Sequence, residues 1–353
     1  MIKNIKKRFK ILIREKLPAF CAKSPKRAFL YYLIFDKSFL REVQAVLAGR
    51  VKHVHDSEKA KSNYFLLVRD THRIEKGLLM RPRRPVFGKG YIKETLDSFE
   101  GVWKSSALEG GDNLQLKWFH DVLGEYFRSA GSEDPLIKQL GEKFNKIISE
   151  QPLPASICDI KIKSIPYFRL VEDRSQITYE EFHKLCRQRR SVRWFLDKPV
   201  PRDLIDKAVL SANQSPSACN RQPFEFRIFD QKELVEQGVS LPMGTKGYGH
   251  SIPVFVVLVG SLDAYFDERD RHVIYIDASL AAMSFMLALE TLGLGSCAIN
   301  WPDIEANEKK MAKFLALKTY QRPLMCMGLG YADPEGLVAF SEKRSINQIR
   351  KYN

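Results

Sequence analysis

The chain has only six cysteines in 353 residues, and no two of them form a Cys-x-x-Cys pair. Disulfide frameworks and structural zinc sites need cysteines at short, repeated spacings, so the pattern argues against both and fits reduced thiols. The pair His53 and His55 has no obvious partner ligands nearby in the sequence. We therefore predict neither a disulfide nor a metal site.

Long apolar runs are also missing, which argues against membrane spans. The nearest candidate, Val273 to Leu292, is interrupted by Asp277, Glu290 and two serines, so it is predicted to be a buried helix. The first sixteen residues hold seven Lys or Arg but no clean apolar stretch or small-residue cleavage site, unlike a secretory signal. We expect a cytoplasmic protein, either free or peripheral to the inner face of a membrane.

Acidic residues are scarce at the beginning of the chain only. Residues 1–100 contain 24 Lys or Arg and 10 Asp or Glu, whereas residues 101–353 contain 33 and 32. Nearly all of the formal net charge of +15 therefore belongs to the first hundred residues. An asymmetry of this size indicates two regions with different partners.

The first basic stretch, residues 1–17, has the alternation of an amphipathic helix, which Pro18 would end. Six apolar side chains share one stripe, and six lysines and arginines surround it. Two interpretations stay open. Either the helix lies on an anionic membrane surface, to which one short helix binds only weakly, or it docks on its own domain with its lysines in solvent.

The second basic stretch, residues 63–92, is helical in period up to Gly77, a natural C-cap residue. It continues as an extended Arg-Pro-Arg-Arg-Pro segment at residues 81–85. The stretch fits either a site for a phosphate or carboxylate of a substrate or a solvated basic loop. Aromatic residues are not interleaved with its charges, as a base-stacking surface requires, so the pattern argues against nucleic acid.

Hydrophobic periodicity predicts an α+β chain. Residues 93–150 are helical in period, with breaks at 110–113 and 131–135. Further along, helices are predicted at 178–188, 201–214, 273–292 and 304–316, and strands at 223–229, 253–260, 296–300 and 323–329. Strands separated by helices suit a sheet covered on both faces. We therefore divide the chain into a mostly helical N-terminal region (1–150), a connecting segment (151–177) and a second domain (178–353).

Two motifs in the second domain carry the chemistry. Residues 189–193 read Arg-Arg-Ser-Val-Arg, donors suited to a phosphate and to the carbonyls of a planar ligand. Residues 215–223 read Ser-Pro-Ser-Ala-Cys-Asn-Arg-Gln-Pro, a turn followed by an amide side chain and a β-rich run. In this order and at this spacing the two motifs resemble those of the FMN-dependent nitroreductase family.

Two later stretches extend the resemblance over residues 178–353. Residues 292–301 resemble the family's Gly-Leu-Gly segment beside the flavin ring, and residues 328–332 resemble the strand before its closing basic pair. That pair is commonly Lys-x-Arg, whereas Lys343 and Arg344 are adjacent here, which leaves the register open by one residue. Trp301 also departs from the family, where a small residue is common, and so alters the expected pocket shape.

The resemblance implies a nitroreductase-like mixed sheet flanked by helices, FMN as cofactor, and a homodimer whose partner contributes an edge strand. Arg193 should lie nearest the pyrimidine edge of FMN and Arg189 nearer the phosphate, while Asn220 meets the ring carbonyls. The full set of implied cofactor-binding residues is Arg189, Arg190, Ser191, Arg193, Asn220, Gln222, Ala298, Ile299, Asn300, Lys343 and Arg344.

The function that the resemblance implies is an FMN-dependent oxidoreductase, which passes hydride from NAD(P)H to a nitro compound, a quinone or a pathway-specific electrophile. It requires no catalytic side chain, and we interpret Cys219 and Cys297 as inert space-filling residues. Two alternatives stay open. One is an FMN-binding module without turnover, whose ring face is closed by Trp301 and the N-terminal region. The other is a peripheral membrane or nucleic-acid adaptor on a flavin-free fold.

Overall fold

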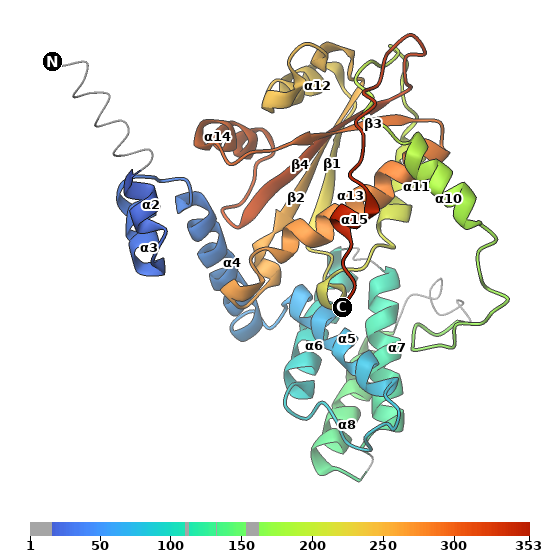
Figure 1. The fold of residues 1–353 in the computed structure, drawn as a ribbon. Coiled ribbons are helices and arrows are strands. Elements are labelled where there is room, and N and C mark those ends of the chain that lie inside the picture. Colours follow the sequence, from blue (N-terminus) through green and yellow to red (C-terminus); the bar gives the residue numbers. More distant parts are fainter. Residues whose placement is uncertain (1–15, 110–112, 132, 153–161) are drawn as a thin grey trace.

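The computed structural model describes residues 16–109, 113–131, 133–152 and 162–353. A set of N-terminal helices lies beside a four-stranded sheet that carries its own helices (Figure 1). The N-terminal helices are α2 (Leu17–Cys21), α3 (Pro25–Ile34), α4 (Leu40–Glu58), α5 (Tyr64–Leu78), α6 (Ile92–Glu109), α7 (Asn113–Ser129) and α8 (Pro135–Glu150). The later elements are α10 (Tyr179–Gln188), α11 (Arg202–Ala212), β1 (Phe224–Phe229), α12 (Lys232–Val239), β2 (Val254–Ser261), α13 (Val273–Thr291), β3 (Gly295–Asn300), α14 (Glu305–Phe314), β4 (Gln321–Gly330) and α15 (Ile346–Ile349).

The sheet has the order β1-β2-β4-β3, and every pair of neighbours is antiparallel. Side chains of a strand alternate between its two faces. On β2, Val254, Val256 and Leu258 face α11 and α13, whereas Phe255 and Val257 face α12 and α14. Because both faces are covered, β2 is apolar throughout. A parallel component comes from the isolated bridge between Ser191 and Ser296, and the predicted α+β class is confirmed.

The N-terminal region has a core of its own, formed by α5, α6, α7 and α8. Phe99, Phe119 and Phe144 lie fully inside it. Helix α4 differs, because it shares a small core with the second domain and packs against the short turn η5 (Leu262–Ala264). The N-terminal region is therefore joined to the sheet domain through α4. The division of the chain at about residues 150 and 178 stays a prediction.

The helices and strands predicted between residues 178 and 353 agree with the structure to within two residues at each end, whereas α2, α3, α4 and α15 were not predicted as separate helices. Helix α5 continues past Gly77 to Leu78, because Gly77 gives room to a ring: a Cβ there would lie 2.1 Å from Phe87. Helix α12 was not predicted. It contains Gly238, whose Cβ would lie 2.6 Å from the ring of Phe255. From the sequence alone, a glycine that allows close packing inside a helix cannot be distinguished from a glycine that ends one.

The predicted amphipathic helix over residues 1–17 falls almost wholly outside the described residues. Pro18, which was expected to end it, lies instead in the first turn of α2. A first-turn position suits proline, because the missing N–H would have no partner within the helix there. The choice between membrane contact and docking for residues 1–17 therefore stays a prediction.

Helix α13 is the core helix of the second domain, as predicted. The stretch 268–291 is long and apolar enough to cross a membrane, and 44% of its apolar window is buried. It packs on the sheet beside α11, which is the position of a core helix in a folded domain (Figure 1). Its outer face leaves one stripe exposed, formed by Ile276, Leu280 and Met283.

Replacing Gly49 with Val is expected to loosen the contact between α4 and the sheet domain. A Cβ at Gly49 would lie 2.6 Å from the carbonyl carbon of Leu262, and backbone cannot move aside cheaply. Overpacking of this kind costs about 1–3 kcal/mol of unfolding free energy, which should lower the melting temperature by several degrees. Gly90→Val is the matched control, since no atom lies within 4 Å of the Cβ position at Gly90. Equal melting temperatures for the two variants would contradict the tight contact.

Candidate functional site

The first motif runs along the free edge of β3. Thr178 caps α10, its hydroxyl accepting a hydrogen bond from the Glu181 N–H at 3.3 Å. The helix ends at Gln188, and the chain then turns alongside β3, where the Val192 N–H donates to the Ser296 carbonyl at 2.9 Å. Residues 189–193 are therefore held as an extended segment at the sheet edge.

Several donors of this edge have no strong partner within the chain. The Arg189 Nε and the Ser296 hydroxyl are buried and lack a hydrogen-bond partner among the described residues. The guanidinium of Arg193 reaches only the Ser191 carbonyl, at 3.5 Å, and lies 5.9 Å from the centre of the Tyr248 ring. Buried polar groups are usually satisfied, so unpartnered donors suit a polar ligand. Cationic and hydroxyl donors of this kind fit a phosphate or the carbonyl edge of a flavin.

The outer side of β3 is open to solvent at alternate positions. Ala298 and Asn300 are exposed, whereas Ile299 is buried in the sheet core and can offer a ligand only its backbone. Trp301 is buried as well, and its indole N–H donates to the carboxylate of Glu308. Trp301 therefore points into the core and does not cover the exposed face of β3.

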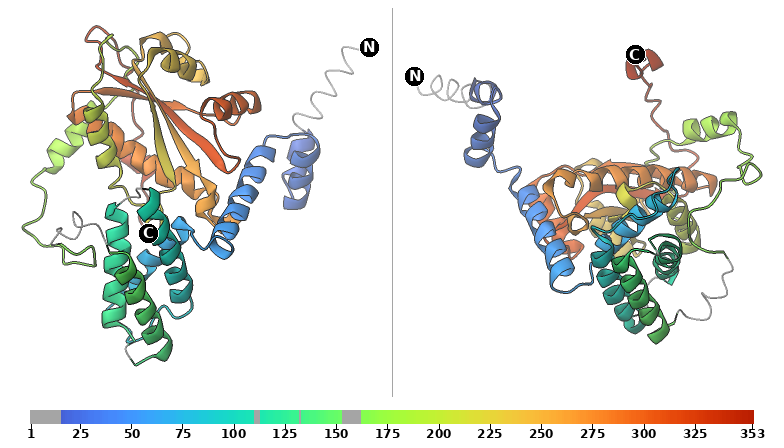
Figure 2. Two further views of the ribbon diagram at one scale, coloured as in Figure 1. Left: turned by 180° about the vertical axis from the view of Figure 1, so that it is seen from behind. Right: turned by 90° about the horizontal axis from the view of Figure 1, so that it is seen from below.

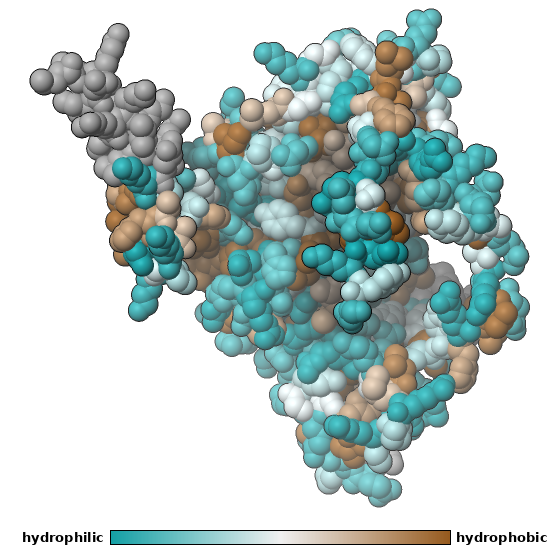
Figure 3. Space-filling view, in the orientation of Figure 1, coloured by the Kyte–Doolittle hydropathy of each residue, from teal (hydrophilic) through white to brown (hydrophobic). Residues whose placement is uncertain are grey.

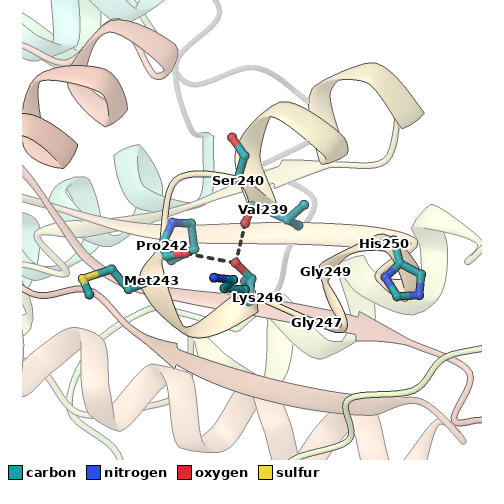
Figure 4. A pocket seen from close by; sticks show the side chains of 9 residues that line it. Val239, Ser240, Pro242, Met243, Lys246, Gly247, Gly249 and His250 are labelled. Carbon is teal, nitrogen blue, oxygen red and sulfur yellow. Dashed lines mark hydrogen bonds between the residues drawn. The ribbon is translucent and has the colours of Figure 1, made fainter.

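A cavity of about 540 Å³ lies next to this edge (Figure 4). It is lined by Val239, Ser240, Pro242, Met243, Thr245, Lys246, Gly247, Gly249 and His250. Its segment is tied to the first motif, because the Ser251 hydroxyl donates to the Arg193 carbonyl at 2.9 Å and the His250 ring lies 5.8 Å from that of Trp194. Burial raises the pKa of Tyr248 to about 12, so this neighbour of Arg193 stays protonated at neutral pH.

The second motif lies at the opposite corner of the sheet. It forms the turn η2 (Ala218–Asn220) immediately before β1, the edge strand farthest from β3. Ser191 pairs with Ser296 at one end of β3, and across the sheet this end faces Phe229, the last residue of β1. The turn η2 lies at the other end of β1, next to its first residue, Phe224. Strands rise about 3.3 Å per residue and lie about 4.8 Å apart, so the two motifs are separated by roughly 25 Å across the sheet. One chain does not bring Arg193 and Asn220 together.

The second motif packs against both the N-terminal region and helix α13. Helix α5 packs against η2, and the Ala218 N–H donates to the carboxylate of Asp277 on α13 at 3.0 Å. Arg221 is buried, with its guanidinium 5.1 Å from the ring centre of Tyr265. Burial raises the pKa of Asp277, although the Ala218 N–H and Arg221 act against the rise. The sequence contained one signal for the contact between the second motif and α13, namely the charged Asp277 within an apolar helix.

The turn itself has an unusual backbone. Cys219, Asn220 and Gln222 all have positive φ, at 57°, 57° and 49°. The Gln222 N–H donates to the Ser217 hydroxyl at 3.1 Å, and the Gln222 side-chain amide donates to the Asn220 side-chain oxygen at 3.2 Å. Residues other than glycine adopt this conformation at a cost, which indicates that the surroundings hold the turn in place.

The closing basic pair lies on a C-terminal arm that leaves the body of the chain (Figure 2). The arm begins beside the first motif, where the Asp333 N–H donates to the Trp194 carbonyl at 3.0 Å. Beyond Gly336 every residue is exposed, and Leu337 and Phe340 are 91% and 76% exposed. Lys343 and Arg344 are exposed on this arm and do not join Arg189 within one chain.

Comparisons with known proteins concern the second domain. Residues 186–239 and 239–331 match a sequence model of the Nitroreductase family. A "Putative NADH dehydrogenase/NAD(P)H nitroreductase" of Methanothermobacter thermautotrophicus is 27% identical over 144 residues, 40% of this chain and 73% of the relative. Iodotyrosine deiodinase 1 of Rattus norvegicus is 21% identical over 209 residues, 51% of this chain and 72% of the relative.

A third relative is a reductase whose name includes the flavin FMN. The FMN reductase [NAD(P)H] of Bacillus subtilis is 25% identical over 188 residues, which cover 49% of this chain and 74% of the relative. All three alignments concern about half of this chain, and the match to the family model begins just before the first motif and ends just after β4. Residues 186–331 of this chain are therefore similar to the Nitroreductase family.

Proposed function

We propose that this protein is a flavin-dependent oxidoreductase that binds FMN and uses NAD(P)H to reduce a small organic acceptor. The match of residues 186–331 to the Nitroreductase family and the reductase names of two relatives support an oxidoreductase. The observation that carries the finer proposal is the set of donors at the β3 edge. Arg189 and Ser296 each keep a buried polar atom without a hydrogen-bond partner among the described residues, at the motif where the family resemblance expects FMN.

A homodimer is part of the proposal, because one chain separates the two motifs. If two copies pack so that the η2 turn of one meets the β3 edge of the other, each site gains Asn220 and Gln222 from the second copy. The exposed stripe on α13 and the exposed C-terminal arm are apolar surfaces that suit such a contact. The arm would carry Lys343 and Arg344 toward the partner's site, where a phosphate needs a cation.

Each residue of the site has a distinct task in this proposal. Arg189 and Ser191 hold the cofactor by hydrogen bonds, and Arg193 places a cation where a reduced flavin ring carries negative charge. FMN, when bound, supplies the acceptance and transfer of hydride. Lys343 or Arg344 completes the phosphate site, while Ala298 and Asn300 leave the ring side of β3 accessible. The chain needs no nucleophile, and Cys297 is buried against the Tyr248 hydroxyl, which suits a structural role.

The acceptor would enter from the side of the cavity beside Arg193. At about 540 Å³ the cavity is large enough for a small aromatic or quinone ring. Because Trp301 is turned into the core, it does not support the alternative of a flavin module with a closed ring face. A cytoplasmic location is also proposed, and the five free cysteines among the described residues suit a reducing compartment.

The purified protein is expected to be yellow and to release FMN, not FAD, on denaturation. The motif cations suit a single phosphate, and the sequence contains no dinucleotide-type Gly-x-Gly-x-x-Gly turn after a strand. Chromatography of the released flavin checks the cofactor, and anaerobic mixing with NADH or NADPH checks hydride transfer by loss of the flavin absorbance. Bound FAD, or no flavin after reconstitution, would exclude the proposed site. FMN that stays oxidised with both nucleotides would favour the module without turnover.

Light scattering of the flavin-loaded protein is expected to give a mass of two chains. The monomer mass is 40.7 kDa, so a loaded species of that mass would show that one chain suffices. Such a result would exclude a site shared between two chains. The FMN assignment would then be judged separately, by chromatography of the released flavin.

A further inference from the structure

A large apolar surface lies on the N-terminal helices, away from the candidate site. Helix α3 contains no buried residue, and its apolar side chains continue onto the outer face of α4. We call this the N-terminal apolar surface, and its main members are each more than half exposed: Phe29, Leu33, Ile34, Phe35, Leu47 and Val51.

This surface is not a scatter of single side chains. Leu47 and Val51 lie one turn apart on α4, as do Phe29 and Leu33 on α3, and Tyr32 connects the two helices through a ring contact with Phe39 at 4.6 Å. The α2–α3 pair lies at the edge of the molecule in every view, joined to the body through α4 (Figures 1 and 2). Contiguous apolar patches of this kind mark interaction sites in soluble proteins.

Positive charge surrounds the apolar side chains. Residues 16–37 contain five Lys or Arg and a single acidic residue, Asp36. None of these cations forms an ion pair with a residue that the structure describes, and Arg27 lies over the ring of Phe20 at 4.4 Å. Figure 3 shows apolar (brown) and hydrophilic (teal) residues intermixed at this corner. Apolar side chains flanked by unpaired cations suit a partner that has both anionic groups and an apolar part.

We propose that α2, α3 and the outer face of α4 form a docking surface for an anionic lipid membrane. The apolar side chains would enter the boundary between headgroups and acyl chains, and the cations would lie among the lipid phosphates. A second copy of the chain fits less well, because it would bring the same unpaired cations together, and like charges repel across an interface. The inference does not depend on FMN or on the dimer.

The attachment of α4 gives the surface a fixed relation to the sheet domain. Ala45 and Gly49 on the inner face of α4 are buried against the second domain, and Arg41 makes a bidentate ion pair with Glu305, with both bonds at 2.8 Å. Membrane docking through the outer face of the same helix would therefore hold the whole protein at the lipid surface.

Vesicle co-sedimentation of the full chain tests this proposal. We expect binding to phosphatidylcholine vesicles that contain phosphatidylglycerol, much weaker binding to phosphatidylcholine alone, and a loss of binding as salt is raised. Replacing Lys23, Lys26 and Arg27 with Gln should weaken binding by about a hundredfold, since each cation near an anionic surface contributes about fivefold. Phe29→Ser with Leu33→Ser should weaken it by at least about tenfold.

The matched control removes three cations from another surface. Changing Arg81, Arg83 and Arg84 to Gln takes the same charge from an exposed loop of the helical bundle and should leave vesicle binding within a few fold. The proposal is overturned if the wild-type chain does not bind anionic vesicles, or if the control loses as much binding as the first variant. It is also overturned if the substitutions at Phe29 and Leu33 only dissociate a larger assembly in light scattering, which would assign the surface to a second copy.

Discussion

Replacing Arg193 with Ala is expected to weaken FMN binding by roughly tenfold or more and to slow reduction by NAD(P)H. The change removes a charge-assisted hydrogen bond, which contributes about 1.5–3 kcal/mol, together with the cation that faces the reduced ring. Within the chain the guanidinium makes a 3.5 Å contact with the Ser191 carbonyl and lies 5.9 Å from the centre of the Tyr248 ring. Both contacts are weak and Arg193 is exposed, so the fold should be little affected. Fluorescence titration with FMN measures the affinity, and anaerobic stopped-flow mixing measures the reduction rate.

The control for Arg193 is the other arginine cluster of the chain. Arg81, Arg83 and Arg84 are exposed between α5 and α6, and Arg83 reaches only Ser129, at 3.3 and 3.4 Å. Changing all three to Ala should leave the flavin spectrum intact, with effects confined to an anionic acceptor or a partner. If this triple variant loses flavin while Arg193→Ala keeps it, the roles of the two clusters are reversed.

Local signals in the sequence predicted most elements of the second domain. The apolar runs that became β1 and β2 each follow a proline, Pro223 and Pro253. Thr178 with Glu181 three residues later is a capping-box pattern, and the structure confirms Thr178 as the cap of α10. Helix α12 was missed because it is eight residues long and contains Gly238, a residue that normally weakens a helix. Its helical state depends on packing against Phe255, which no local pattern reveals.

The arrangement of the candidate site could not be predicted in the same way. The family resemblance placed Arg193 and Asn220 around one FMN, yet distance in a sheet depends on strand order. The order β1-β2-β4-β3 puts the two motifs on opposite edges, and strand order is decided by long-range pairing. The support of η2 by α5 is equally non-local, since it joins residues about 150 positions apart in the sequence. Family resemblance alone supplied the idea of a shared site.

A mixed dimer is expected to regain one functional site from two defective chains. One chain carries Arg189→Ala and Arg193→Ala, and the other carries Asn220→Gly. Glycine is chosen because Asn220 has a φ of 57°, where alanine would be strained. Each homodimer has the same defect in both of its sites. Losing two charge-assisted bonds should weaken FMN binding to the first homodimer by about a hundredfold or more.

The mixed dimer differs because a shared site combines motifs from two chains. One of its sites contains both defects, whereas the other pairs the intact β3 edge of the second chain with the intact η2 turn of the first. Isolated through two different affinity tags, it should bind one FMN per dimer at wild-type affinity, half the wild-type amount. If both motifs served the same chain, every site would carry a defect and no tight FMN would be found. The stoichiometry of tightly bound flavin therefore decides whether the roughly 25 Å between the two motifs is bridged by a second copy of the chain.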